Sequence, residues 1–322
     1  MFASSALRKA VVVAFRIPAV TFGLLRYLIP RLWCPWRPPG LDWQDGPHAD
    51  SLAFAGFSGR FSATVVPLFV KRADVQSSLP PELTIVDDDQ LPDWLQGRDD
   101  HPVILLIGKQ ASLGRRRVVF GLLQTYPLFR PYLETFVAIP FLKPKDSEES
   151  SPCFHFVRVP CSTFWPTELG IFQMGWFKLQ CPMEMRQEGQ TLHYSIMDER
   201  NRRPLLTAET DLTDAVELTA SDDCLSKVIS MLSQPHVLFV GKGMDTYRFD
   251  LRFEAAGLKA VSARGTVHPG LLPSITEPIE FDSPKISQSE FGAFHLETTF
   301  MNRGLKITPR PFLYTTRVYL RR

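Results

Sequence analysis

Strand-length apolar runs, separated by turn residues, recur along this chain and restrict its fold more than any other feature. The clearest is residues 247–254, where apolar and charged side chains alternate and no proline interrupts them. Such alternation is typical of a half-buried antiparallel strand. Similar runs predict strands at residues 61–70, 103–107, 154–159, 192–197, 236–240 and 312–320. Many short strands favour an all-β or β-rich barrel or sandwich.

Helical patterns are few. Apart from the N-terminal segment, we predict helices at residues 73–78 and 221–232, the second capped by Asp222 or Asp223. Residues 143–152 and the proline-rich residues 266–289 are predicted loops. We therefore expect a basic, apolar head with its linker at residues 1–50, followed by a single β-rich domain at residues 51–322.

Positive charge is concentrated in the head. The chain has 36 Lys and Arg against 34 Asp and Glu, and the first 41 residues hold six of the basic residues and no acid. The remainder is slightly acidic and has no basic excess that would neutralise phosphates. Nucleic acid is therefore not an expected partner.

The head is apolar between residues 10 and 33, but Arg16, Pro18, Arg26 and Pro30 interrupt it. No uncharged run reaches the ~18 residues of a transmembrane helix, so we do not expect it to span a bilayer. Residues 1–33 are compatible with an interfacial helix on an anionic membrane, with an organelle-targeting peptide or with a segment packed on the protein itself. A secretory signal fits less well, because Arg16 and Pro18 shorten its apolar core.

The cysteines indicate an intracellular protein. They number five, are widely spaced and form no Cys-x-x-Cys pair, so we expect reduced thiols rather than disulfides or a zinc site. The seven histidines show no spacing typical of a metal site. We predict neither a metal nor another cofactor. The sequence does not specify the oligomeric state, and a homo-oligomer is left open.

The best indication of chemistry is Lys178, which follows Trp176 and Phe177 and precedes Leu179, together with Glu134 in the apolar run 132–140. Lysine is strongly hydrated, so Lys178 either extends its amine into water or is desolvated. Desolvation favours the neutral amine, which attacks ketones to form iminium ions. An iminium withdraws electrons from the adjacent carbon, as decarboxylation of a β-keto acid or an aldol-type step requires.

At these residues the chain resembles the acetoacetate decarboxylase-like superfamily. The family's Tyr-x-Glu and the apolar stretch after it match Tyr132, Glu134 and residues 138–140. Its second motif, Gly-Arg-Glu, two residues, a small residue, an aromatic and then Pro-Lys-Lys, corresponds to residues 170–179. Residues 73–83 look like its early segment ending in Leu-Pro-x-x-Leu. The resemblance spans residues 55–215 and implies the family's β-rich barrel.

The second motif departs from the family pattern. Ile171 and Phe172 replace Arg-Glu, Phe177 replaces the proline and Leu179 replaces the second lysine. The resemblance gives Lys178 the role of Schiff-base former. In acetoacetate decarboxylase an adjacent cationic group activates that lysine. Leu179 removes this group here, so desolvation must activate Lys178.

The resemblance implies a lyase-type enzyme that acts on a β-keto acid or related carbonyl metabolite through a lysine iminium. Glu134 would orient the substrate or transfer protons, and Tyr132, Trp176 and Phe172 would contact the substrate. Arg60, one residue away from the family's early arginine, is the candidate for holding a substrate carboxylate. The apolar replacements predict a substrate that is larger and less polar than acetoacetate.

Alternatives are left open at this point. The same barrel would serve as a cyclase, dehydratase or carrier of a hydrophobic metabolite without an iminium, or as a lipid-binding module anchored by the head. Leu179 and the missing Arg-Glu favour the first of these over strict decarboxylation, whereas Glu134 and Lys178 favour the iminium. In the simplest alternative, Lys178 and Glu134 are ordinary strand residues in contact with water.

Overall fold

The computed structural model describes residues 57–119, 122–145, 151–169, 178–240, 243–251, 253 and 256–303. The head and the predicted strand at residues 312–320 lie outside these residues. The division into a head and one domain therefore stays a prediction.

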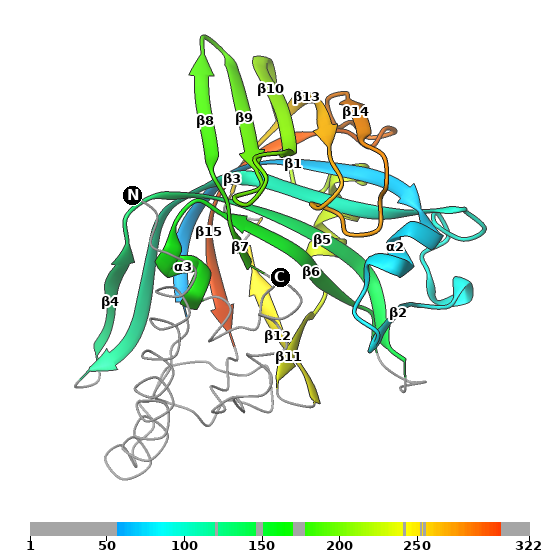
Figure 1. The fold of residues 1–322 in the computed structure, drawn as a ribbon, viewed down its shortest axis with the longest axis horizontal. Helices are drawn as coiled ribbons and strands as arrows, with labels where there is room; N and C mark the ends of the chain where they lie inside the picture. The colour runs from blue at the N-terminus through cyan, green and yellow to red at the C-terminus, as the bar shows by residue number, and fades with distance from the viewer. Residues whose placement is uncertain are drawn as a thin grey trace.

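Seven strands form a curled sheet whose last strand pairs again with the first (Figure 1). In spatial order they are β1 (Phe57–Lys71), β3 (Asp100–Val119), β5 (Tyr132–Pro144), β6 (Cys153–Cys161), β11 (His236–Val240), β12 (Gly243–Asp250) and β15 (Phe294–Arg303). Neighbouring strands are antiparallel except β6 and β11, which are parallel and pair at one position, Phe154 with His236. The predicted β-rich barrel with few helices is thus confirmed.

The sheet continues beyond this barrel. From β15 it extends through β13 (Gly257–Val267), β10 (Pro204–Glu217), β9 (Thr191–Met197) and β8 (Met183–Glu188). The remaining strands add to its edges: β2 (Leu83–Ile85) pairs with β5, β4 (Leu122–Phe129) with β3, β7 (Lys178–Gln180) with β6, and β14 (Ile279–Ser283) with β13. The expected loop at 266–289 is corrected in part: residues 266–267 end β13 and residues 279–283 form β14, whereas residues 268–278 form turns and an isolated bridge.

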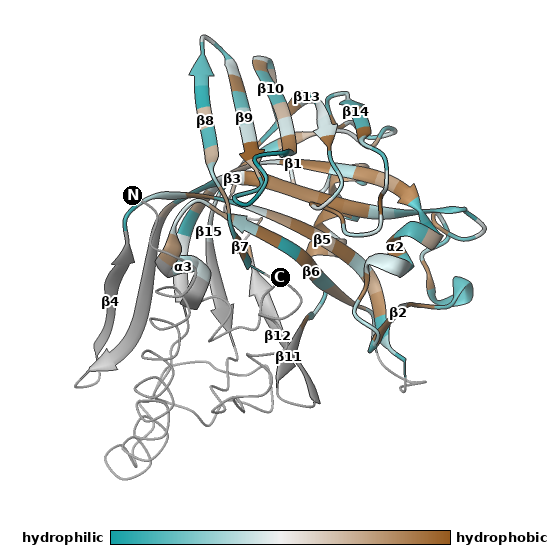
Figure 2. Ribbon diagram, viewed as in Figure 1, coloured by the Kyte–Doolittle hydropathy of each residue, from teal (hydrophilic) through white to brown (hydrophobic). Residues whose placement is uncertain are grey.

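Apolar side chains cover both faces of the central strands, where β3 and β5 are largely brown in Figure 2. One core gathers side chains from β1, β3, β5, β6, β15 and helix α4 (Asp223–Leu232), including Phe61, Leu106, Phe136 and Phe156. A second apolar core lies between the opposite face of these strands and the strands β9, β10 and β13. Every residue of the run 103–107 is buried for this reason, so the run does not alternate.

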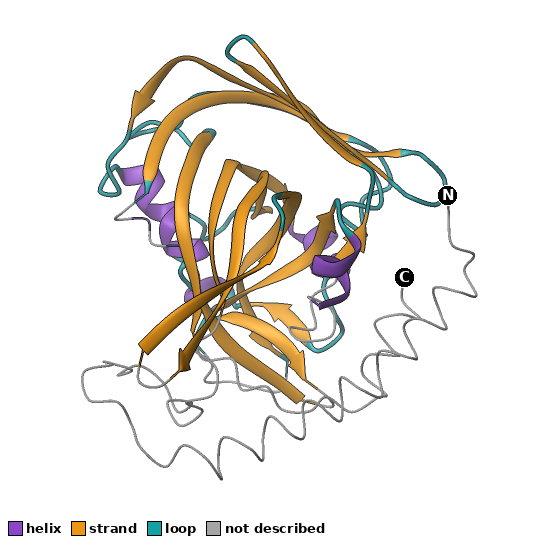
Figure 3. Ribbon diagram, turned by 90° about the vertical axis from the view of Figure 1, so that its left-hand side faces the viewer, coloured by secondary structure: helices purple, strands orange, loops and turns teal. Residues whose placement is uncertain are grey.

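Strands dominate the described residues (Figure 3). Helix α2 (Arg72–Ser78) and helix α4 correspond to the predicted helices, and α3 (Phe164–Leu169) was not predicted. Leu225, Val228 and Leu232 recur at helical spacing along α4 and are buried in the first core. No helix in the described part of the chain has the length and apolarity that crossing a bilayer needs.

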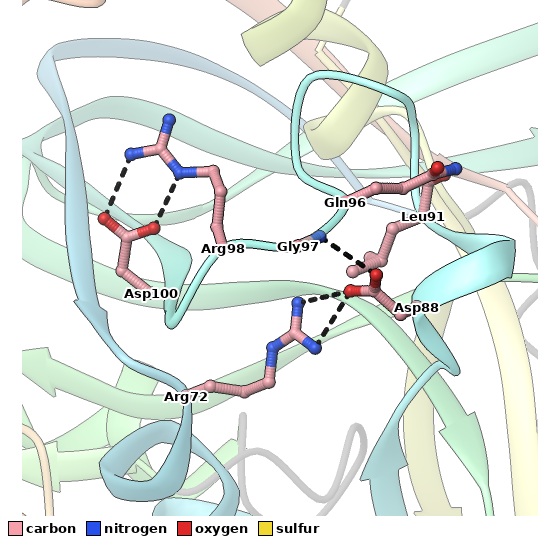
Figure 4. Close-up of polar contacts among 7 residues, drawn as sticks. All are labelled: Arg72, Asp88, Leu91, Gln96, Gly97, Arg98 and Asp100. Carbon is pink, nitrogen blue, oxygen red and sulfur yellow. Dashed lines mark hydrogen bonds and ion pairs between the residues drawn. The ribbon is translucent and has the colours of Figure 1, made fainter.

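A polar cluster fixes the chain at the start of β3 (Figure 4). Asp88, in the short 3₁₀ helix Asp88–Gln90, accepts hydrogen bonds from the Gly97 amide at 2.9 Å and from Arg72 at 3.1 and 3.2 Å. The Gly97 amide is the main cause that lowers the pKa of Asp88. Arg98 pairs with Asp100, the first residue of β3, at 2.7 Å. These contacts anchor the strand that leads to the candidate site.

Candidate active site

Three neighbouring strands bring Glu134 and Lys178 to one place. Glu134 of β5 lies opposite Cys161 of β6, and Lys178 of β7 lies beside Val159 of β6. Residues paired across strands, and residues two apart along a strand, point to the same face of a sheet. Glu134, Cys161, Val159 and Lys178 therefore share a face, which carries the first apolar core.

Lys178 and Glu134 form a buried ion pair. The Lys178 Nζ donates a hydrogen bond to Glu134 Oε1, and the two side chains are only 3% and 1% exposed. The simplest alternative, in which both residues contact water, therefore does not hold. The expected desolvation of Lys178 is present, but it comes with a carboxylate partner, as buried charges generally require.

Gln110 of β3 holds the second oxygen of this carboxylate. Its Nε2 donates a hydrogen bond to Glu134 Oε2 at 3.1 Å, and the side chain is 2% exposed. Sequence reasoning missed Gln110. The signal in the sequence was weak, because Gln110 is only a polar residue just after the buried run 103–107. The pairing of β3 with β5 is what places Gln110 opposite Tyr132.

Tyr132 lies two residues before Glu134 and is buried on the same face. Burial and the negative charge of Glu134 raise the pKa of the Tyr132 hydroxyl well above its usual range. Tyr132 therefore keeps its proton at neutral pH and is a hydrogen-bond donor to the Glu134 side chain.

Cys161 adds a thiol to the same site. Burial raises the pKa of Cys161, although the positive charge of Lys178 acts in the opposite direction. A protonated thiol is a poor nucleophile, so Cys161 is not a candidate nucleophile in this state. Among the described residues, no group of His, Cys, Asp and Glu side chains is arranged to hold a metal ion.

Among the remaining predicted substrate-binding residues, the structure describes only Arg60. Arg60 is exposed on β1, whereas the neighbouring Phe61 is buried in the first core. Its role in holding a substrate carboxylate stays a prediction. Phe172 and Trp176 lie outside the described residues.

Comparisons with known proteins find similar solved structures. No family model matches the chain, and no curated protein does. An acetoacetate decarboxylase from Legionella pneumophila has a TM-score of 0.49 and 12% identity, over 77% of this chain and 84% of that one. An acetoacetate decarboxylase-like enzyme from Sphingomonas wittichii has a TM-score of 0.48 and 13% identity, over 81% and 96%.

A third match is the enduracididine biosynthesis enzyme MppR complexed with pyruvate, with a TM-score of 0.46 and 11% identity over 83% of this chain and 96% of that one. At such identities the likeness concerns the fold alone. Two of these three structures are an acetoacetate decarboxylase and an acetoacetate decarboxylase-like enzyme.

Proposed function

We propose that this protein is a lyase-type enzyme that acts on a hydrophobic β-keto acid or related carbonyl metabolite through an iminium on Lys178. The observation that carries the proposal is the buried contact between Lys178 Nζ and Glu134 Oε1. Moving one proton from the ammonium to the carboxylate gives a neutral amine and a neutral acid. The net charge of the pair stays zero, so burial does not oppose this step as it opposes creation of a single charge.

The neutral amine then attacks the substrate carbonyl carbon and forms a carbinolamine. Glu134 returns its proton to the carbinolamine oxygen, the C–O bond breaks and water leaves. The product is an iminium cation beside the Glu134 carboxylate, so the opposite charges of the resting pair are restored. Proton transfer of this kind typically contributes roughly 10² to 10⁴-fold to a rate.

The iminium supplies the electron sink for the bond that is lost. In a β-keto acid, the electron pair of the C–C bond to the carboxylate moves toward the iminium nitrogen, and CO₂ leaves an enamine. A proton taken up from solvent adds to the enamine carbon and regenerates an iminium, and water then hydrolyses it to the ketone and the Lys178 ammonium, which pairs with Glu134 again. An aldol-type cleavage follows the same electron movement with a different leaving group.

Borohydride trapping tests this proposal. The protein is incubated with a panel of hydrophobic β-keto acids and borohydride, which reduces an iminium to a stable secondary amine. The peptide containing Lys178 should gain the mass of the reduced ligand, and Lys178→Met should lose both the adduct and turnover. Lys259→Met, at a half-exposed lysine of β13, is the control and should keep both. Full turnover in Lys178→Met would exclude the iminium.

A second function is supported by the same contact. A carboxylate bound directly to Lys178 also holds the lysine as an ammonium, which donates hydrogen bonds but does not attack a carbonyl. Leu179 in place of a second lysine adds to this argument. A cyclase, dehydratase or carrier would then bind the metabolite without a covalent bond. Ligand binding that persists in Lys178→Met, with no trapped adduct in either protein, would favour this function.

A further inference from the structure

We infer that the side-chain carbonyl of Gln110 selects substrates that carry a hydroxyl or N–H group close to the reacting carbonyl. The inference rests on the proposed function, because Lys178 defines where the reacting carbonyl lies. It extends that function by naming a feature of the substrate. It assigns to Gln110 a role in specificity.

The orientation of the Gln110 amide is fixed by its partner. A carboxylate only accepts hydrogen bonds, so the nitrogen of the amide must face Glu134, and Nε2 lies 3.1 Å from Oε2. The amide oxygen, Oε1, then points elsewhere. It is buried and has no hydrogen-bond partner among the described residues. A buried acceptor of this kind favours any bound molecule that brings a donor to it.

The Gln110 side chain lies next to the residues that are proposed to react. One carboxylate contacts both side chains, Gln110 through Oε2 and Lys178 through Oε1. Only this one carboxylate group separates the Gln110 amide from the Lys178 amine, so a ligand whose carbonyl meets Nζ lies beside the amide. Phe61 lies opposite Gln110 in the β1–β3 pairing and belongs to the apolar core. The ligand that fits is mainly apolar and has one donor near its carbonyl.

A set of three matched ligands tests the inference on the unmodified protein. The first is an apolar ketone with a hydroxyl group on the carbon next to the carbonyl, the second is its methoxy analogue and the third is its deoxy analogue. The methoxy group keeps an acceptor but lacks the donor. The hydroxyl ligand should bind roughly 5- to 150-fold more tightly than both analogues, as expected for a buried acceptor that gains or lacks its partner.

Calorimetric dissociation constants are the readout, because they do not require an iminium. In Gln110→Met the preference should fall to about one-fold, since methionine fills the space without the carbonyl. Gln187→Met, at an exposed position of β8, is the control and should keep the preference. Borohydride trapping with the same ligands is measured separately, so failure of the iminium is distinguishable from failure of the selection.

Equal affinity for the hydroxyl and deoxy ligands would overturn the inference and indicate that water satisfies Oε1. An unchanged preference in Gln110→Met would overturn it as well, as would absence of binding by the hydroxyl ligand. If Gln110→Met does not fold, the comparison of hydroxyl with methoxy ligand on the unmodified protein still decides.

Discussion

Lys178 and Glu134 form their ion pair across β6, the strand that lies between their own strands β7 and β5. The two residues are 44 positions apart in sequence. Their contact exists only when three strands are in register, because a shift of one residue would turn either side chain to the opposite face. The pair therefore links the chemistry of the candidate site to the stability of the fold.

Removal of one member of this pair should destabilise the protein strongly. Lys178→Met leaves Glu134 buried without its cation, and we expect the free energy of unfolding to fall by about 3 to 5 kcal/mol. The double variant Lys178→Met/Glu134→Gln should recover much of this loss, because neither charge remains. Denaturant titration of the three proteins measures the effect. Additive losses in the double variant would contradict a direct pair.

Glu134→Gln should slow turnover while the substrate still binds. Glutamine matches glutamate in shape but does not accept the proton of Lys178, so we expect kcat to fall roughly 10² to 10⁴-fold with a smaller change in KM. Steady-state kinetics on a substrate identified by trapping provide the measurement. A kcat close to that of the unmodified protein would show that Glu134 moves no proton.

Gly108 should not tolerate a side chain. It lies opposite Glu134, and a Cβ there would be 2.2 Å from the backbone oxygen of Ser62 and 2.6 Å from the Cβ of Ala63. We expect Gly108→Ala to lower the free energy of unfolding by about 1 to 3 kcal/mol, because β1 and β3 must move apart. Gly257→Ala is the matched control, since its nearest neighbour would be 3.8 Å away. Equal unfolding midpoints for the two variants would contradict this packing.

Stability should fall below neutral pH because of buried histidines. Burial lowers the pKa of His155 and of His101 to about 4, and burial with the charge of His155 lowers the pKa of His236 well below its usual range. The unfolded chain binds these protons near pH 6.5, so stability is fully present above that pH and is lost as pH falls toward 4. Each histidine should contribute about 1.4 kcal/mol per pH unit in this window.

Unfolding free energies between pH 7 and pH 4.5, measured on the unmodified protein and on His236→Gln, check this prediction. Glutamine keeps an acceptor for the Phe156 amide, which lies 3.4 Å from His236 Nε2. In this variant, the slope of the unfolding free energy against pH should decrease by the contribution of one histidine. An identical slope in His236→Gln would mean that His236 is accessible to protons in the folded state.

Deletion of residues 1–36 should leave the β-rich domain folded. The head has six Lys and Arg and no acid within the first 41 residues, so its loss should release the protein from anionic liposomes or abolish organelle import. Liposome pelleting and thermal unfolding of both proteins measure these two properties. Loss of cooperative unfolding in the truncated protein would instead assign the segment to the core.

Local sequence patterns determined much of the secondary structure. The apolar runs at 61–70 and 154–159 lie within β1 and β6, and the pattern at 221–232 coincides with α4 to within two residues. Residue type alone also singled out Lys178 and Glu134, because an isolated charge in an apolar run is costly to bury without a partner. These features depend only on residues that are close together along the chain, so the sequence alone is enough to predict them.

The tertiary structure decided which residues meet. Strand pairing is non-local, so the sequence did not reveal that Gln110 contacts Glu134. It also did not reveal that β6 lies between β5 and β7. A bulge shifts the β1–β3 register: Arg60 pairs with Ser112 and Phe61 with Gln110, so Ala111 of β3 is the extra residue. Because side chains alternate with a period of two, a single extra residue reverses which face each one occupies. Such a reversal depends on the partner strand, and no pattern within one strand reveals it.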